Sequence, residues 1–553
     1  MKKINLTLTA ICMVFLSLYA QNSEKEKAEA YLLNKHELTF TFQVEKDEDV
    51  KKFAENISVV NYNPDNNTVT AWANVTQFRG FELFNIPYKV STLENEVKEL
   101  EIYDVRPLSS RSQNSSLTFP LSSYPTYAEY AQQMQTFEND YPNLVNKFSI
   151  GSTTKGDKEL LFVKISDNVK EDEQEPKLML TSSMHGDEIA GYPMMLTLID
   201  YILSVYSNTA HPDYSRIKNL VENAEIWINP NANPDGTYHK SNNNTSVVNA
   251  RRGNANNVDL NRNYPDNVLG PHTDGEIYQA ETLAFMDLAA STHFVISANL
   301  HSGTELFNYP FDNAYVKDYE HSDGNWFEFI GTEYAMHAQT DANSGHTSIP
   351  SYINKASYMT DDDDSSIFTS SGVTHGAEWY KVYGGRQDYM NFYHQCKEVT
   401  IELSDIKILP ESQLVNYWYY NRDALLGFLT QGTYGFRGVV KDAITDEPIE
   451  AKVTLVNHDA YGSNTFSGSL YGDYYRPVKA GTYTIKFEAP NYQSITLVNQ
   501  TILDYETKIL KDVLMTPAAV VQSTDLTISN EKVSTVNLDW TLASEEVEEV
   551  IDK

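Results

Sequence analysis

Hydrophobic and polar positions in the first part of the chain alternate with two different periods. Period-two apolar patterns, typical of strands, occupy 38–44, 59–62, 68–73 and 88–91, and helical patterns fill 47–57 and a stretch from about residue 75. This order predicts a small α+β domain in which helices cover an antiparallel sheet. We assign 21–117 to this region, including a polar, serine-rich linker at 109–116.

The rest of the chain divides into three segments with different patterns of hydrophobic and polar residues. Strand and helix patterns alternate from 118 to 431, which predicts an α/β domain with a mixed, largely parallel sheet flanked by helices. Short alternating strand patterns separated by Gly, Pro and Asp fill 433–516 and predict a β-sandwich. Residues 517–553 are polar, and we interpret them as a tail or linker.

Residues 1–20 have the pattern of a signal peptide. Two lysines precede an apolar stretch, and Ala20 offers a small residue for cleavage. A membrane span is the alternative, but the stretch is short and polar sequence follows it. Cys12 is preceded by Ile11, where a lipoprotein signal has a small residue, which disfavours a lipid anchor. We therefore expect a secreted, periplasmic or cell-surface protein with no membrane span in its mature chain.

Composition narrows the choice of partners. The 553 residues include 42 basic and 76 acidic side chains, a formal net charge of −34, which argues against nucleic acid as a partner. Cys396 is the one cysteine outside the leader, so the mature chain has no intramolecular disulfide. Packing and metal binding are left as sources of stability.

Three strand patterns of the central region end in groups that bind metals or protons. His185 follows an apolar strand pattern, and Glu188 comes three residues later, before a helical pattern. This spacing places an imidazole and a carboxylate on one side of a turn, as two zinc ligands require, although such pairs are also common in solvated turns. His301 ends a second strand pattern, and Glu402 lies in a third. Open α/β sheets build their sites at the carboxyl ends of such strands.

A polar segment between these strands offers carboxylate-binding groups. Arg252 and Arg262 lie ten residues apart, and Asn261 precedes the second of them. Guanidinium groups are well suited to gripping a carboxylate in two places. Taken singly, each of these residues could equally be an ordinary surface group.

Together the motifs resemble those of the zinc metallocarboxypeptidases. The matching motifs, in chain order, are His185-x-x-Glu188, Asp259-Leu260-Asn261-Arg262-Asn263, Asn299-Leu300-His301, Gly384-Gly385-x-Gln387-Asp388 and Thr400-Ile401-Glu402-Leu403. The chain is most similar to the regulatory subgroup typified by carboxypeptidases D, N, E and M. The resemblance covers about 118–431, and 433–516 resembles the transthyretin-like sandwich of that subgroup. It implies an exopeptidase that acts on peptide or protein C-termini.

The resemblance also implies roles for individual residues. One zinc ion would be bound by His185, Glu188 and His301, with Asp259 orienting a ligand histidine. Glu402 would be the general base, and Arg252 would polarise the scissile carbonyl and stabilise the oxyanion. The groups expected to hold the substrate are Asn261 and Arg262 at its terminal carboxylate and Tyr380 closing over it.

The resemblance further implies a preference for C-terminal Lys or Arg. Asp312, eleven residues after His301, would pair with the basic side chain, and Gln387 would lie at the pocket base. The alternative is that Asp312 only caps a turn after Pro310. Arg386 stands where the subgroup commonly has Met and would oppose this preference if its side chain faced the pocket. Two other positions depart from the motifs of the subgroup: Ser302 replaces a usual Gly, and His375 stands where Asn is common. The four aspartates at 361–364 could add negative charge at the rim of the pocket.

Other functions remain open from the sequence. The same scaffold could serve an amidase or a hydrolase of cell-wall peptides, or a zinc-containing module without catalytic activity. The sandwich could make the chain chiefly an adhesion protein, although the complete motif set argues against that. The region 37–101 resembles the activation segment of the digestive subgroup, which suggests an inhibitory prodomain; a constitutive folding or docking module is the alternative.

Overall fold

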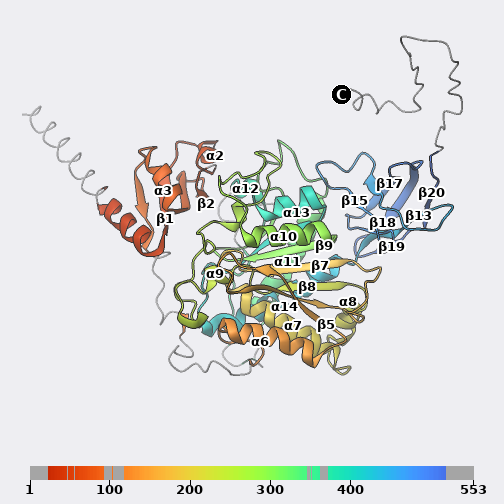
Figure 1. Ribbon diagram of the computed structural model, residues 1–553, viewed down its shortest axis with the longest axis horizontal. Helices are drawn as coiled ribbons and strands as arrows, with labels where there is room; N and C mark the ends of the chain where they lie inside the picture. Colours follow the sequence, from red (N-terminus) through yellow and green to blue (C-terminus); the bar gives the residue numbers. More distant parts are fainter. Residues whose placement is uncertain are drawn as a thin grey trace, which may run out of the picture.

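The computed structural model describes residues 21, 23–46, 48–54, 56–92, 102–103, 117–345, 349, 352–360 and 372–518. The expected leader (1–20), the serine-rich linker, the acidic run 361–364 and most of the tail (519–553) lie outside the described residues. Figure 1 shows a central body of sheet and helices, with a smaller N-terminal body (red) and a C-terminal one (blue) packed at its two sides.

The central body is built on an eight-stranded sheet in the order β11-β10-β12-β9-β7-β8-β6-β5. Its strands are β5 (Val145–Ser152), β6 (Glu159–Ile165), β7 (Lys177–Ser182), β8 (Glu225–Asn229), β9 (Phe294–His301), β10 (Glu305–Tyr309), β11 (Val373–His375) and β12 (Lys397–Leu403). The neighbours β12, β9, β7 and β8 are parallel, as are β10 and β11, whereas β10–β12, β8–β6 and β6–β5 are antiparallel. The prediction of an α/β fold with a mixed sheet is confirmed; the sheet is parallel mainly at its centre.

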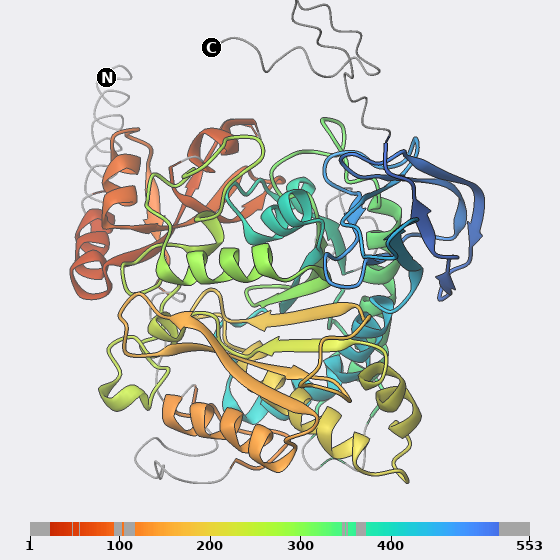
Figure 2. The same ribbon diagram turned by 45° about the vertical axis from the view of Figure 1, so that its right-hand side comes forward.

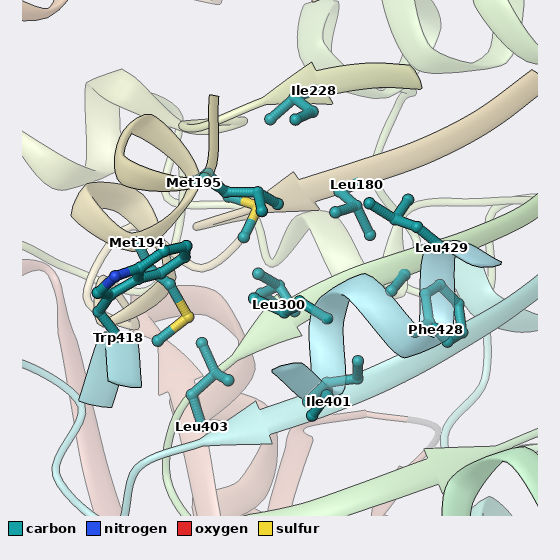
Figure 3. Close-up of a cluster of buried hydrophobic side chains, with 14 of the residues drawn as sticks. Leu180, Met194, Met195, Ile228, Leu300, Ile401, Leu403, Trp418, Phe428 and Leu429 are labelled. Atoms are coloured by element: carbon teal, nitrogen blue, oxygen red, sulfur yellow. The ribbon is translucent and has the colours of Figure 1, made fainter. Parts of the chain in front are cut away.

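Helices cover both faces of this sheet because its central strands are apolar on both sides. On one face lie α6 (Tyr127–Asp140), α7 (Gly191–Tyr206), α8 (Tyr214–Val221), α11 (Gly324–Ala342) and α14 (Leu414–Gln431). Figure 3 shows Leu180, Leu300 and Ile401 of the sheet packed with Met195 of α7 and Phe428 of α14. The opposite face packs against α10 (Ala280–Ser291) and α13 (Arg386–His394). Shorter helices are α9 (Pro234–Thr237), α12 (Gly376–Trp379), η2 (Asn242–Asn244), η3 (Leu260–Arg262) and η4 (Glu411–Gln413).

The N-terminal body is a four-stranded antiparallel sheet in the order β2-β3-β1-β4. Its elements are β1 (Glu37–Gln43), α2 (Glu48–Ala54), β2 (Ser58–Asn63), β3 (Thr68–Asn74), α3 (Val75–Glu82) and β4 (Tyr88–Val90). Phe40, Phe42, Phe53, Phe78 and Phe81 form its core. Figure 2 shows this body lying against the central one. We call residues 23–92 the N-terminal domain.

The C-terminal body consists of two small sheets that enclose an apolar core. One sheet contains β13 (Gly435–Asp442), β16 (Asp473–Arg476), β19 (Thr507–Ile509) and β20 (Val513–Met515); the other contains β14 (Lys452–Leu455), β15 (Thr465–Phe466), β17 (Gly481–Glu488) and β18 (Ile495–Ile502). Arg476 of β16 reaches the central body, where it forms an ion pair with Asp323 at 2.9 Å. None of the described helices is long and apolar enough to cross a membrane.

Candidate active site

Two histidines and a glutamate converge at the carboxyl ends of β7 and β9. His185 and Glu188 lie in the loop that joins β7 to α7, and His301 is the last residue of β9. Glu188 Oε2 lies 2.8 Å from Nδ1 of each histidine, and the two Nδ1 atoms are 3.1 Å apart. All three side chains are buried. The sequence pattern predicts a helix directly after Glu188, but α7 begins only at Gly191.

The chemistry of these three groups fits zinc. Two imidazole nitrogens and one carboxylate oxygen within 4.8 Å of one another form the donor set of a zinc site that keeps one position open. Burial lowers the pKa of His301 to about 4, so its ring is neutral and has a lone pair for a metal. Burial alone raises the pKa of Glu188, but His185 and Lys407 together lower it well below its ordinary value. The group is therefore ionised.

Asp259 holds the outer nitrogen of one metal-binding histidine. Its Oδ1 lies 3.0 Å from Nε2 of His185, and its Oδ2 accepts a 2.9 Å hydrogen bond from Nε of Arg252. Burial raises the pKa of Asp259, but Arg252, His185 and Arg262 together lower it far below its ordinary value. An anionic acceptor at Nε2 keeps the ring proton there and leaves Nδ1 for a metal.

Arg252 is held between two carboxylates rather than free at the surface. Its Nη1 donates to Glu188 Oε1 at 2.9 Å while its Nε donates to Asp259. Lys407 Nζ lies 3.3 Å from the same Glu188 oxygen. Sequence reasoning missed Lys407, because a single lysine after a strand carries no signal of its own. Two fixed cations beside the metal-binding carboxylate make this end of the cleft suited to developing negative charge.

Glu402 lies across the strand pair from His301. The two residues are register partners in the parallel pair β12–β9, and Glu402 also faces Leu306 of β10. Glu402 is 8% exposed, and its Oε2 has no hydrogen-bond partner among the described residues. Burial, followed by the charge of Glu188, raises its pKa well above the ordinary value. A carboxyl group with an open oxygen beside the donor cluster can accept and return a proton.

The predicted carboxylate-binding residues lie in η3, and one of them, Arg262, contacts the N-terminal domain. Arg262 is buried, with Nη1 donating to its neighbour's carbonyl, Asn261 O, at 2.8 Å and Nη2 donating to Val59 O of β2 at 2.7 Å. Asn261 Oδ1 accepts the backbone N–H of Arg386 at 3.0 Å. The group expected to grip a substrate is thus bonded to the protein's own backbone.

Further contacts join the N-terminal domain to this cleft. Tyr380, the residue expected to close over the substrate, packs against the aromatic core of that domain. Asn74 Nδ2 donates to Asn257 O at 3.1 Å, and Glu37 Oε1 accepts the backbone N–H of Arg252 at 3.4 Å. The N-terminal domain therefore contacts the predicted carboxylate-binding group and the backbone beside the candidate metal site together.

Asp312, the residue predicted to line the specificity pocket, is buried among polar side chains next to these residues. Its Oδ1 accepts from Asn308 Nδ2 at 3.1 Å and from Gln387 Nε2 at 3.0 Å. A methyl group added at Gly385 would lie 3.5 Å from Asn261 Oδ1 and 3.8 Å from Asp312 Oδ2, so this pocket adjoins the carboxylate-binding residues. Burial raises the pKa of Asp312 to about 6. The contacts of its carboxylate go to side chains of other elements.

The guanidinium of Arg386 does not face this pocket. It forms an ion pair with Glu398 at 2.8 Å and donates to Thr181 of the central strand β7. The side chain is fully buried in that direction. Arg386 is therefore paired with Glu398 and does not neutralise the charge of Asp312.

Comparisons with known proteins agree with this geometry. The sequence profile of the zinc carboxypeptidase family matches residues 130–424. Human carboxypeptidase D is 35% identical over 370 residues, which are 66% of this chain and 25% of that protein, so the chain matches about a quarter of its length. The mouse carboxypeptidase N catalytic chain is 29% identical over 410 residues, covering 69% of this chain and 85% of that one. In fold, the chain is similar to the carboxypeptidase A of Helicoverpa armigera, with 18% identity and a TM-score of 0.51 over 71% of this chain and 97% of that one.

Proposed function

Since the chain belongs to the zinc carboxypeptidase family, we propose that it removes single residues from the C-terminus of peptides or proteins. The observation that carries this proposal is the convergence of His185, Glu188 and His301 beside Glu402, with Arg262 in the adjoining part of the cleft. Digestion of peptides that differ only in their last residue, with identification of the released amino acid, tests it.

His185, Glu188 and His301 would hold the zinc ion. Zinc in such a site supplies Lewis acidity and lowers the pKa of water from about 16 to about 7. Asp259 orients the His185 ring through its Nε2. Arg252, already held in place by two carboxylates, is a preorganised donor where negative charge develops on the substrate carbonyl, and such a donor is typically worth ~100-fold or more.

Glu402 would move the proton. Its carboxylate takes a proton from the attacking water and delivers it to the leaving amine, which splits the peptide bond without releasing a free amide anion. Its open Oε2 and its place opposite His301 support this assignment.

Arg262 and Asn261 would make the enzyme an exopeptidase. A guanidinium and an amide offer directed donors for a terminal carboxylate, which an internal peptide bond does not have. Tyr380 would close over the bound residue. Asn261 is held by the backbone N–H of Arg386, which supports a fixed orientation of its amide.

Asp312 and Gln387 would select a basic last residue. A buried carboxylate without a cation is costly, so the pocket penalises a neutral side chain as well as rewarding Lys or Arg. The amides of Asn308 and Gln387 hold one oxygen of Asp312 in place. Since Arg386 is paired with Glu398, it leaves this charge available for a substrate.

The N-terminal domain would inhibit the enzyme until it moves away. It supplies Val59 O to the carboxylate-binding guanidinium, Glu37 to the backbone of Arg252, and an apolar surface to Tyr380. Each contact occupies a group assigned to the substrate or lies beside one. A permanent folding module would not need to contact these groups.

The β-sandwich at 433–516 would have a structural role, as in the transthyretin-like domain that it resembles. Its Arg476 is buried between Asp323 of the central body and Asp459 of its own. Deleting the sandwich should lower yield or stability rather than abolish zinc binding.

For residues 1–20 we propose a role in export, which is supported by the basic start and apolar run of the leader.

A further inference from the structure

Arg386 is a fully buried cation that the reaction itself does not use. It is the first residue of α13. Its Nε donates to Glu398 Oε1 at 2.8 Å, and Glu398 Oε2 accepts from Ser297 Oγ at 2.6 Å. The guanidinium also lies 5.0 Å from the ring centroid of Phe285. Two of its three guanidinium nitrogens are bonded and Nη1 has no hydrogen-bond partner among the described residues, so the two bonds that it makes indicate a defined structural task.

The second arm of Arg386 begins a chain of contacts that ends at a metal-binding histidine. Its Nη2 donates to Thr181 Oγ1 at 2.5 Å, and the Thr181 hydroxyl donates to Oδ1 of Asn299 at 3.2 Å. The other end of this amide lies 2.8 Å from Nε2 of His301. Thr181 and Asn299 are register partners in β7 and β9, and both are buried.

Metal binding at His301 determines which atoms donate and which accept along this series of hydrogen bonds. For Nδ1 of His301 to face a metal, the ring proton must be on Nε2, where it needs an acceptor. The two ends of the Asn299 amide have the same size, so its orientation follows from its neighbours. In the structure the amide nitrogen faces His301 and the amide oxygen faces Thr181; turning the amide by 180° lets its oxygen accept from His301 while its nitrogen donates to Thr181 Oγ1, which also accepts from Arg386.

We propose that Arg386 is a positioning residue for the metal site, acting through Thr181 and Asn299 on the orientation and proton of His301. The guanidinium fork holds Glu398 with one nitrogen and Thr181 with another, so the hydroxyl oxygen is fixed as an acceptor for Asn299. The backbone N–H of the same residue holds Asn261, which links the metal ligand to the carboxylate-binding side of the cleft. This inference rests on the zinc site of the proposed function.

Zinc affinity tests the relay without relying on turnover. Thr181→Val removes the hydroxyl at nearly constant volume and should weaken zinc binding at least ~10-fold, as changes to groups behind a metal ligand typically do. Thr181→Ser keeps the hydroxyl and should restore affinity to within about twofold of wild type. Competition with a chromophoric chelator measures both. Ser297→Ala is the matched control: it removes the hydroxyl that donates to Glu398 Oε2, the oxygen that Arg386 does not use, and should bind zinc as wild type does.

A second variant separates the relay from a general loss of packing. Arg386→Lys keeps a cation beside Glu398 but lacks the fork, so it should also weaken zinc binding. If both act through one chain, Thr181→Val with Arg386→Lys should lose no more affinity than the weaker-binding single variant. The proposal would be overturned if Thr181→Val bound zinc with wild-type affinity, or if the losses of affinity multiplied in the double variant. If Thr181→Val does not fold, wild-type zinc affinity in Arg386→Lys would overturn it instead. Absence of tight zinc binding in the wild-type chain would instead contradict the proposed function.

Discussion

The guanidinium of Arg262 donates a 2.7 Å hydrogen bond to the backbone carbonyl oxygen of Val59. Arg262 is the residue assigned to the substrate's terminal carboxylate, and Val59 belongs to the N-terminal domain. A carbonyl carries only a partial charge, so it is a weaker partner for a guanidinium than a carboxylate, which accepts two charge-assisted hydrogen bonds. On this assignment the domain and a substrate would compete for one donor, which the domain holds without an ion pair.

Removing the N-terminal domain should raise activity. We expect a chain that starts near Thr118 to have a kcat/KM at least ~10-fold higher than the full chain, equivalent to about 1.4 kcal/mol, mainly through a lower KM. Steady-state kinetics on a peptide ending in Lys measures the ratio. Equal specific activity of the two chains would remove the inhibitory role and leave a folding module.

Docking of that domain should weaken as pH rises. Burial, followed by the charge of Asp187, raises the pKa of Glu37 in the docked state to about 7 from an ordinary 4.5, while Arg251 and Lys407 oppose the shift. The docked state therefore binds the proton more tightly. The contribution of protonated Glu37 to the free energy of docking is fully present below about pH 4.5 and is lost as pH rises through about 7.

The activity of the full chain relative to the shortened chain should accordingly increase between these two pH values. Glu37→Gln should flatten this dependence, because the amide does not titrate. Glu45→Gln, an exposed position on the same domain, should leave it unchanged. A wild-type ratio that is constant across the range would contradict the role of Glu37.

Asp312 should determine the preference for basic ends. We expect C-terminal Lys or Arg to be favoured over Leu or Phe by at least ~100-fold in kcat/KM, about 2.7 kcal/mol, and Asp312→Asn to collapse this ratio with zinc content unchanged. The exposed Asp318→Asn serves as control. Because the carboxyl must be ionised to pair with a cation and its pKa is about 6, the preference should fall below that pH. A wild-type enzyme that favours aliphatic ends would refute the assignment of this pocket.

Arg476 should hold the β-sandwich on the central body. Its guanidinium forms ion pairs with Asp323 and Asp459, and all three side chains are buried. Arg476→Met leaves buried carboxylates with one partner fewer, and loss of such a partner costs roughly 3 kcal/mol or more. Urea unfolding should show this loss in the free energy of unfolding, whereas Arg437→Met, at a half-buried position of β13, should change that free energy little. Equal midpoints for both variants would argue against this role.

The sequence predicted which groups come together better than it predicted their surroundings. His185, Glu188, His301 and Arg262 stand in short motifs whose spacing carries information. The helix after Glu188 starts at Gly191, later than its pattern predicts, and the N–H of Ile189 before it donates to Lys407 O, a contact between segments distant in the chain. Such long-range contacts leave no local periodicity.

Two other features were beyond sequence reasoning for different reasons. The contact at Val59 uses a backbone oxygen, which any residue supplies, so no side chain marks it. Arg386 was recognised as unusual, but the direction of its side chain depends on Glu398 and Thr181, which lie on two other elements. A neighbouring motif could not indicate which way it pointed.

Product identification by mass spectrometry tests the central claim most directly. A peptide ending in Lys, offered as the free acid and as the amide, is incubated with zinc-loaded enzyme that lacks the N-terminal domain. We predict release of the terminal Lys alone from the free acid, little cleavage of the amide, and a loss of at least ~10³-fold in Glu402→Gln with zinc retained. Glu305→Gln on the neighbouring strand, opposite Leu403, should keep its activity. Internal cleavage, equal cleavage of the amide, or a near-normal rate in Glu402→Gln would contradict the account.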